Sequence, residues 1–104
     1  MKSLSVFKAD ETYKRYFTNE VLTKGAAYVV SDENAVCGFF SFSFLDEKKA
    51  AFNFPYCLDK KAIQLAFDNF LNDYPQISEI KSLSRQKLDF LGFDNKRYLR
   101  KGGS

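Results

Sequence analysis

The sequence predicts an α+β domain, in which a mostly antiparallel mixed sheet is covered by two main helices, much as in three-layer α/β proteins. Two observations lead to this prediction. Apolar residues with a period of two, typical of strands, occur in several segments, and an apolar stripe of helical period follows one of them. Both patterns meet in residues 50–71, where a strand leads into a helix. The expected order of elements is β-α-β-β-β-α-β-α-β.

The N-terminal segment is expected to form a strand and a helix. In residues 3–8 apolar and polar side chains alternate, as in a short strand. Asp10 stands where the N-cap of a helix belongs, and Glu11 adds a negative charge in the first turn. A helix of about three turns is expected to follow. It should end at Lys24, with Gly25 as its left-handed cap.

Two further strands are predicted before residue 46. Residues 26–30, AAYVV, are uninterruptedly apolar, which indicates a strand covered on both faces. Residues 31–34 have the composition of a turn. In residues 36–45 three phenylalanines point one way and two serines the other. Together with the strand over 50–58, these segments are expected to form an antiparallel meander.

The strand over 50–58 and the helix after it are the centre of the prediction. Five apolar residues share the strand face that is expected to be buried: Ala50, Phe52, Phe54, Tyr56 and Leu58. Pro55 cannot donate to a sheet, so it indicates an edge, a bulge or a place where strands part. Asp59 is a suitable N-cap for a helix that begins at Lys60. A helix N-terminus beside Lys60 and Lys61 is a natural position for an anion, although such lysines also fit a solvated surface.

The C-terminal segment is predicted to complete the sheet. Residues 77–83 read as a strand, and residues 85–91 as a short helix that stops at Gly92. A last strand is expected over 96–101. No linker divides the chain, so residues 1–101 are predicted to form a single domain, followed by a flexible tail at 102–104.

Composition restricts the function classes. The chain has 104 residues, no His and a net charge of +3, which does not indicate nucleic acid or an anionic membrane as partner. Without His, neither a Ser-His or Cys-His pair nor a His-ligated metal is available, and no metal site is expected. Cys37 and Cys57 lie in apolar runs, as buried thiols in a reducing compartment do. The start lacks an apolar signal segment, so the expected location is cytoplasmic.

Two local segments carry a resemblance to a known family. Val36, Gly38 and the aromatic run after them follow a turn, and Phe90-Leu91-Gly92-Phe93 ends the last predicted helix. In this layout the chain resembles a shortened member of the GNAT (N-acetyltransferase) superfamily. The resemblance implies a GNAT-like fold, acetyl-CoA as the cofactor and transfer of its acyl group to an amine.

The resemblance also implies a cofactor site at the start of the central helix. The residues that would bind acetyl-CoA there are Leu58, Lys60, Lys61, Ala62, Ile63 and Gln64. The family pattern at this helix start is Arg/Gln-x-x-Gly-x-Gly/Ala, and the corresponding residues 59–64 differ at all three signature positions. Small residues let a pyrophosphate approach the backbone amides, whereas Gln64 is long and Asp59 is negatively charged.

Under this resemblance, Tyr56 and Cys57 are the remaining candidates for catalytic residues, because they lie close to the expected acyl group. The positions where the family often has a general acid and a base are occupied by Leu88 and Asn53, neither of which exchanges a proton near neutral pH. Tyr56 could act as an acid, but a tyrosine on an apolar strand face is typical of a core. Cys57 could react only as a thiolate, and a buried strand cysteine is typically inert.

Three functions follow as hypotheses. The first is an acetyl-CoA-dependent N-acetyltransferase, in which backbone amides of residues 56–58 orient the thioester. The second is a non-catalytic module of the same fold that binds a protein partner or a CoA-type ligand. Nucleic-acid binding is the weakest, because the phenylalanines alternate with serines as core residues do. An exposed sheet edge could also pair two copies into a homodimer.

Overall fold

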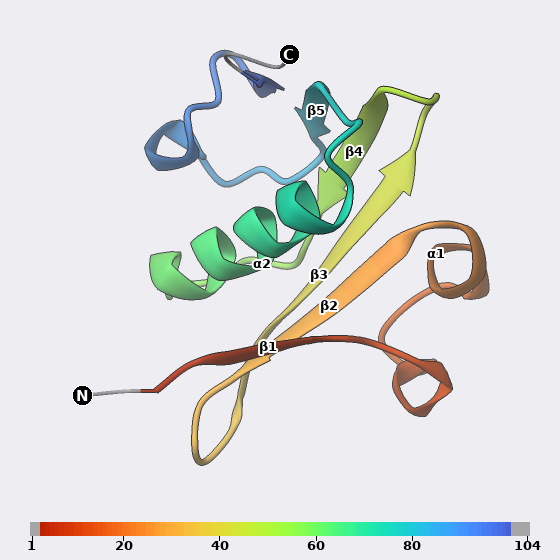
Figure 1. Cartoon of the computed structure of the whole chain (residues 1–104). Helices are drawn as coiled ribbons and strands as arrows, with labels where there is room; N and C mark the ends of the chain where they lie inside the picture. The colour runs from red at the N-terminus through yellow and green to blue at the C-terminus, as the bar shows by residue number, and fades with distance from the viewer. Residues whose placement is uncertain (1–2, 101–104) are drawn as a thin grey trace.

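The computed structural model describes residues 3–100, in which six strands form one mixed sheet (Figure 1). The elements in chain order are β1 (Ser5–Lys8), the 3-10 turn η1 (Glu11–Tyr13), α1 (Asn19–Lys24), β2 (Ala26–Ser31), β3 (Val36–Phe44), β4 (Lys49–Asn53), α2 (Lys60–Asp73), β5 (Glu79–Ser82), the 3-10 turn η2 (Asp89–Leu91) and β6 (Arg97–Leu99). The strands lie in the sheet in the order in which they occur in the chain. All neighbours are antiparallel except β4 and β5, which are parallel and are connected through α2. The predicted α+β class is confirmed.

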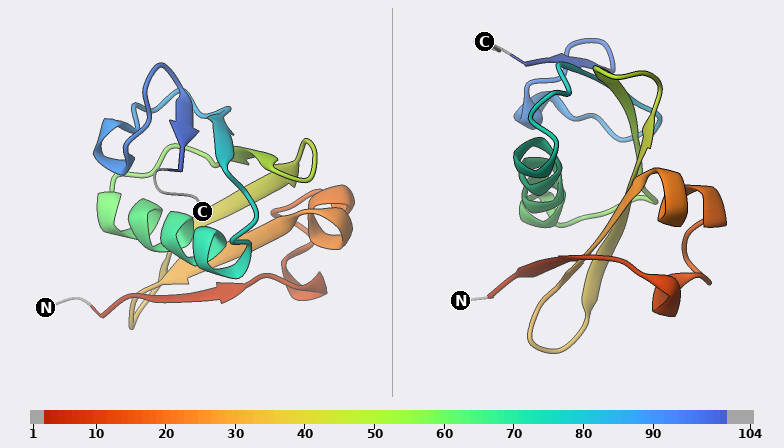
Figure 2. Two further views of the ribbon diagram at one scale, coloured as in Figure 1. Left: turned by 45° about the horizontal axis from the view of Figure 1, so that its top comes forward. Right: turned by 45° about the vertical axis from the view of Figure 1, so that its right-hand side comes forward.

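The two faces of the sheet are covered differently. α2 lies across one face, whereas η1 and α1 lie against the other, as the right-hand view of Figure 2 shows. Between these two layers, residues 26–30 of β2 are all buried, so the predicted cover on both faces of this strand is confirmed. None of the helices within residues 3–100 has the length and apolar content needed to cross a membrane.

Phenylalanine rings fill the core between the sheet and α2. Phe42 on β3 stacks on Phe52 of β4 with ring centroids 4.4 Å apart, and on Phe70 of α2 at 3.8 Å. All three rings have no exposed surface. α2 begins at Lys60 after its N-cap Asp59, as predicted, because its apolar stripe faces this core.

The N-terminal helix differs from the prediction. Instead of three continuous turns, the chain forms η1, a bend, and the six-residue α1, whose N-cap is Thr18. Tyr13, Tyr16 and Phe17 all contact the ring of Phe39 on β3 from this bent chain, although they do not lie on one continuous helix. Gly25 is not a left-handed cap, since its φ is −109°. A Cβ atom at Gly25 would collide with the carbonyl oxygen of Phe42, so glycine is required by close approach.

The C-terminal elements are shorter than predicted. The helix expected over 85–91 is only the 3-10 turn η2, which ends at Gly92 with a φ of +96°. Asn95 and Lys96 have φ values of 54° and 66° and form the turn before β6, so Lys96 does not belong to the strand. The remainder of the last predicted strand at residue 101, and the predicted tail at 102–104, lie outside the described residues.

Candidate functional site

The sheet opens next to Pro55, where β4 and β5 stop pairing. Their parallel register runs from Lys49 opposite Glu79 to Phe52 opposite Ser82, and one more bond joins the Leu83 N–H to the carbonyl of Phe52 at 2.8 Å. β4 is an interior strand, so Pro55 does not mark a sheet edge. It lies two residues beyond β4, where the strands part and a ladder donor is not needed.

The side chain of Gln86 bridges this opening. Its Oε1 accepts a hydrogen bond from the Cys57 N–H at 3.1 Å, and its Nε2 donates to the Cys57 carbonyl at 2.7 Å. Gln86 thus bonds the two main-chain groups of Cys57 as a neighbouring strand would. Its own N–H donates to the Ser84 hydroxyl at 3.1 Å, which fixes the loop after β5. Nothing in the sequence pattern marked Gln86, because a glutamine in a loop has no periodic signal.

The start of α2 is capped by Asp59. The Asp59 carboxylate accepts hydrogen bonds from the N–H groups of Lys61 at 3.0 Å and Ala62 at 3.4 Å, and its carbonyl accepts from Ile63 at 3.3 Å. These amide groups belong to the helix N-terminus at which, from the sequence, we expect an anion such as a phosphate to bind. The Lys60 ammonium lies 5.4 Å from the centroid of the Phe90 ring, in a cation–π contact.

The other residues predicted to bind a cofactor are distributed around this helix start. Leu58 is 85% exposed in the loop before α2, whereas Ala62 and Ile63 are fully buried in the core. Gln64 donates from Nε2 to Asp68 one turn further along, at 2.9 Å. Its side chain is therefore held along the helix surface, and it does not fill the space at the helix start as the sequence suggested.

Tyr56 and Cys57 have opposite environments. Tyr56 is 74% exposed, so the expectation that it and Leu58 lie on a buried strand face is wrong. The regular alternation stops because β4 ends at Asn53 and Pro55 turns the chain. Cys57 is buried, and its Sγ donates to the carbonyl of Asp59 at 3.5 Å. Burial raises the pKa of the Cys57 thiol, which disfavours the thiolate needed for nucleophilic attack.

A hollow on the opposite face of the sheet was not predicted. We call it the aromatic pocket; it lies between the η1–α1 segment and the ends of β3 and β4, with a volume of about 480 Å³. It is lined by Tyr16, Phe17, Thr18, Val21, Phe39, Ser41, Ser43, Asn53, Phe54, Pro55 and Leu83. Asn53, which stands where the family often has a carboxylate, therefore faces this pocket. The signal that could have found it is the close spacing of Tyr13, Tyr16 and Phe17, which lie in the segment expected to form a helix of about three turns.

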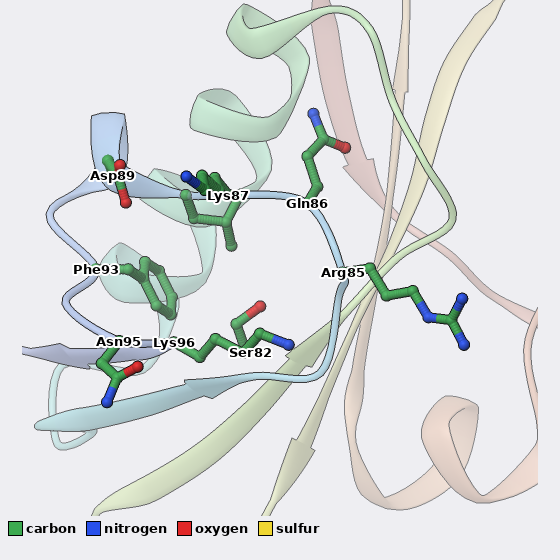
Figure 3. A pocket seen from close by; sticks show the side chains of 9 residues that line it. Ser82, Arg85, Gln86, Lys87, Asp89, Phe93, Asn95 and Lys96 are labelled. Atoms are coloured by element: carbon green, nitrogen blue, oxygen red, sulfur yellow. The ribbon is translucent and has the colours of Figure 1, made fainter.

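A second, smaller hollow lies between the loop after β5 and the turn before β6. It has a volume of about 260 Å³ and is lined in part by Lys87, Phe93 and Lys96 (Figure 3). Arg85 points away from it, and Lys87 and Lys96 are exposed. Leu88, where the family often has a tyrosine, is a buried residue of this loop and carries no proton donor.

Known structures share this arrangement of strands and helices. One is a GNAT family acetyltransferase from Elizabethkingia anophelis with acetyl-CoA bound, which aligns with a TM-score of 0.54 and 13% identity over 76% of this chain and 63% of that chain. The chain has the GNAT fold. The aminoglycoside N(6′)acetyltransferase from Legionella pneumophila subsp. pneumophila str. Philadelphia 1 also matches, with a TM-score of 0.51 and 7% identity, over 76% of this chain and 69% of that chain.

The sequence itself gives no such match. A comparison with models of protein families finds none, and neither does a comparison with curated proteins. At 13% and 7% identity, the similarity to these two acetyltransferases shows a shared fold and nothing about activity. The chain spans less than two thirds of the length of the Elizabethkingia enzyme. The resemblance stated from residues 36–40 and 90–93 is therefore confirmed at the level of the fold, and the roles of the predicted site residues stay predictions.

Proposed function

We propose that this chain is a GNAT-fold domain that binds a small ligand and does not transfer an acyl group. The observation that carries the proposal is the bridge from Gln86 to Cys57. A cofactor arm that enters the opening between β4 and β5 would pair with the main-chain groups beside the gap. Both of these groups on Cys57 are already bonded within the protein, at 3.1 and 2.7 Å.

The start of α2 supports the same conclusion. Acetyl-CoA would bring its pyrophosphate to the N–H groups of residues 60–63. The carboxylate of Asp59 occupies the N–H groups of Lys61 and Ala62 and places a negative charge beside them. An anion would have to displace this cap, so the residues present do not fit the cofactor as they stand.

The chemistry available at the gap is also poor. Cys57 is a buried thiol with a raised pKa, and Tyr56 points into solvent from a loop. The side chains that stand where the family often has a base and an acid are the amide of Asn53 and the alkyl chain of Leu88. Neither group exchanges protons at neutral pH.

Thermal unfolding with acetyl-CoA tests the proposal. At about 1 mM acetyl-CoA we expect no rise in the midpoint, because a ligand stabilises only a native state that binds it. In the same samples, release of free CoA in the presence of primary amines should stay at the rate measured without protein. A midpoint that rises with acetyl-CoA concentration, or protein-dependent release of CoA, would contradict the proposal.

The second candidate is an acetyl-CoA-dependent N-acetyltransferase. It is favoured by the parting of β4 and β5 beside Lys60 and Lys61, and by a fold neighbour that has acetyl-CoA bound. In that case Gln86 is a displaceable side chain, and orientation of the bound thioester supplies most of the rate. Gln86→Ala should then enlarge the midpoint shift with acetyl-CoA, and Lys60→Glu with Lys61→Glu should abolish it. Under the first proposal none of these variants shows a shift.

A further inference from the structure

The aromatic pocket exposes apolar surface that the fold itself does not cover. Tyr16 stacks on Phe39 with centroids 4.4 Å apart and an interplanar angle of 11°, and Phe17 meets the same ring edge-on at 5.9 Å. Tyr16 and Leu83, which both line the pocket, are each 54% exposed. A planar apolar ligand in the pocket would remove part of this surface from water.

The pocket has no charge to offer a ligand. None of its described lining residues is Asp, Glu, Lys or Arg, although 28% of the chain is charged. A charged ligand group that loses its water there would find no opposite charge to compensate it. The lining therefore favours an uncharged ligand and disfavours a cationic amine or a carboxylate.

Two polar side chains that line the pocket can orient such a ligand. Within residues 3–100, neither the Asn53 amide nor the Ser43 hydroxyl has a hydrogen-bond partner in the protein. The neighbouring Ser41 hydroxyl is already engaged, since it donates to the Asn53 carbonyl at 3.1 Å. Asn53 and Ser43 together offer donors and acceptors to a single polar substituent.

The size of the pocket completes the description. Its volume of about 480 Å³ lies in the usual range for small-molecule sites, roughly 300–1,000 Å³, and suits a bicyclic ring with a short polar arm. We infer that the aromatic pocket binds a small, uncharged aromatic molecule with one hydrogen-bonding substituent. This inference deepens the proposed function, on which it rests, by naming the class of ligand.

Three indole compounds that differ in charge test the inference on the whole chain. Tryptophol is neutral, tryptamine is a cation and indole-3-acetate is an anion at neutral pH. Titration followed by backbone amide shifts in NMR should give saturable changes with tryptophol, centred on Phe39, Ser41 and Asn53. The dissociation constants of tryptamine and indole-3-acetate should be at least about tenfold higher, because each buries an uncompensated charge. No saturable change with tryptophol, or equal binding of all three compounds, would overturn the inference.

Asn53→Asp supplies the sharpest variant, because it replaces an exposed amide by a carboxylate of the same shape. In this variant the affinity for tryptamine should rise roughly fivefold, as expected for a nearby opposite charge at partial exposure, and that for indole-3-acetate should fall. Asn34→Asp, in the turn between β2 and β3, is the matched control and should change neither. If both variants respond alike, the compounds do not bind in the aromatic pocket and the inference is wrong.

The two proposals fail in different measurements. Acetyl-CoA tests the opening at Cys57, and the indole compounds test the opposite face of the sheet. Absence of tryptophol binding together with absence of an acetyl-CoA shift overturns the assignment of the ligand and leaves the non-catalytic proposal standing. Release of CoA from acetyl-CoA overturns the non-catalytic proposal whatever tryptophol does.

Discussion

The side-chain amide of Gln86 bonds both the N–H and the carbonyl of Cys57, 29 residues earlier in the chain. Each residue comes from a loop that follows a strand, Cys57 after β4 and Gln86 after β5. One glutamine thus continues the connection between the two strands past the point where their ladder ends. It stabilises an opening that would otherwise leave two main-chain groups without partners.

Loss of this bridge should destabilise the domain. Gln86→Ala removes two partly buried hydrogen bonds and leaves the Cys57 N–H and carbonyl to water, so we expect the free energy of unfolding to fall by about 1–3 kcal/mol. Urea denaturation measures this. Gln64→Ala is the control: the Gln64 side chain bonds Asp68 along the helix surface, and losing this bond should cost a few tenths of a kcal/mol. Equal effects of the two substitutions would show that the bridge contributes nothing.

Cys57 should react slowly with alkylating reagents. Burial raises the pKa of its thiol, so both the thiolate fraction and the access of a reagent are low. We expect its rate of modification by iodoacetamide to rise at least about tenfold on unfolding in urea, as judged by peptide mass spectrometry. Rapid labelling of Cys57 in the native protein would indicate an activated thiol, and would support the catalytic role expected from the sequence.

Tyr28 should make stability depend on alkaline pH. Burial and the Asp73 carboxylate, which accepts a bond from the Tyr28 hydroxyl at 2.8 Å, raise the pKa of Tyr28 well above its usual value near 10. The unfolded chain releases this proton near pH 10 while the folded chain keeps it. The stabilisation is therefore complete below about pH 10 and is lost progressively above it.

The variant Tyr28→Phe should reduce this dependence. Between about pH 10 and pH 11 its free energy of unfolding should decline less than that of the wild type, by up to about 1.4 kcal/mol per pH unit for one proton. Tyr56→Phe, which changes an exposed ring, is the control and should keep the wild-type slope. Identical slopes for the wild type and Tyr28→Phe would contradict the prediction.

Gly25 should not tolerate a side chain. Alanine there would place its Cβ against the carbonyl oxygen of Phe42, a backbone atom of a central strand that cannot move freely. We expect Gly25→Ala to lower the free energy of unfolding by about 1–3 kcal/mol in chemical denaturation. Gly92→Ala gives a useful comparison, because its Cβ would have ordinary contacts and only the left-handed backbone would cost, about 1 kcal/mol. A neutral Gly25→Ala would mean that α1 can shift away from β3.

Local signals explain which parts of the fold were predictable. α2 and its cap at Asp59 followed from a long apolar period and one polar residue before it, and both depend on residues close in sequence. The strands β2 and β3 were equally clear. Pro55 indicates correctly that the strands part near it. The predicted strand nevertheless included Tyr56 and Leu58, whereas β4 ends at Asn53 and both side chains are exposed.

The site depended on contacts between distant residues, and these were not predictable. No periodicity connects Gln86 with Cys57, and the sequence does not show that Asp59 occupies the N–H groups of α2. The aromatic pocket exists because the segment around Tyr16 bends back onto Phe39. A helical pattern alone could not distinguish that bend from a continuous helix.

The agreement between strand order and chain order has a consequence for how the domain folds. From β1 to β4 each strand can pair with the strand made just before it, through short turns or, between β1 and β2, through the segment that holds η1 and α1, so the chain entropy lost at each step is modest. Docking of β5 alongside β4 has to wait until α2 has crossed the sheet, because a parallel neighbour cannot arrive through a tight turn. That crossing is therefore expected to limit the rate of folding, with the phenylalanine core closing in the same event.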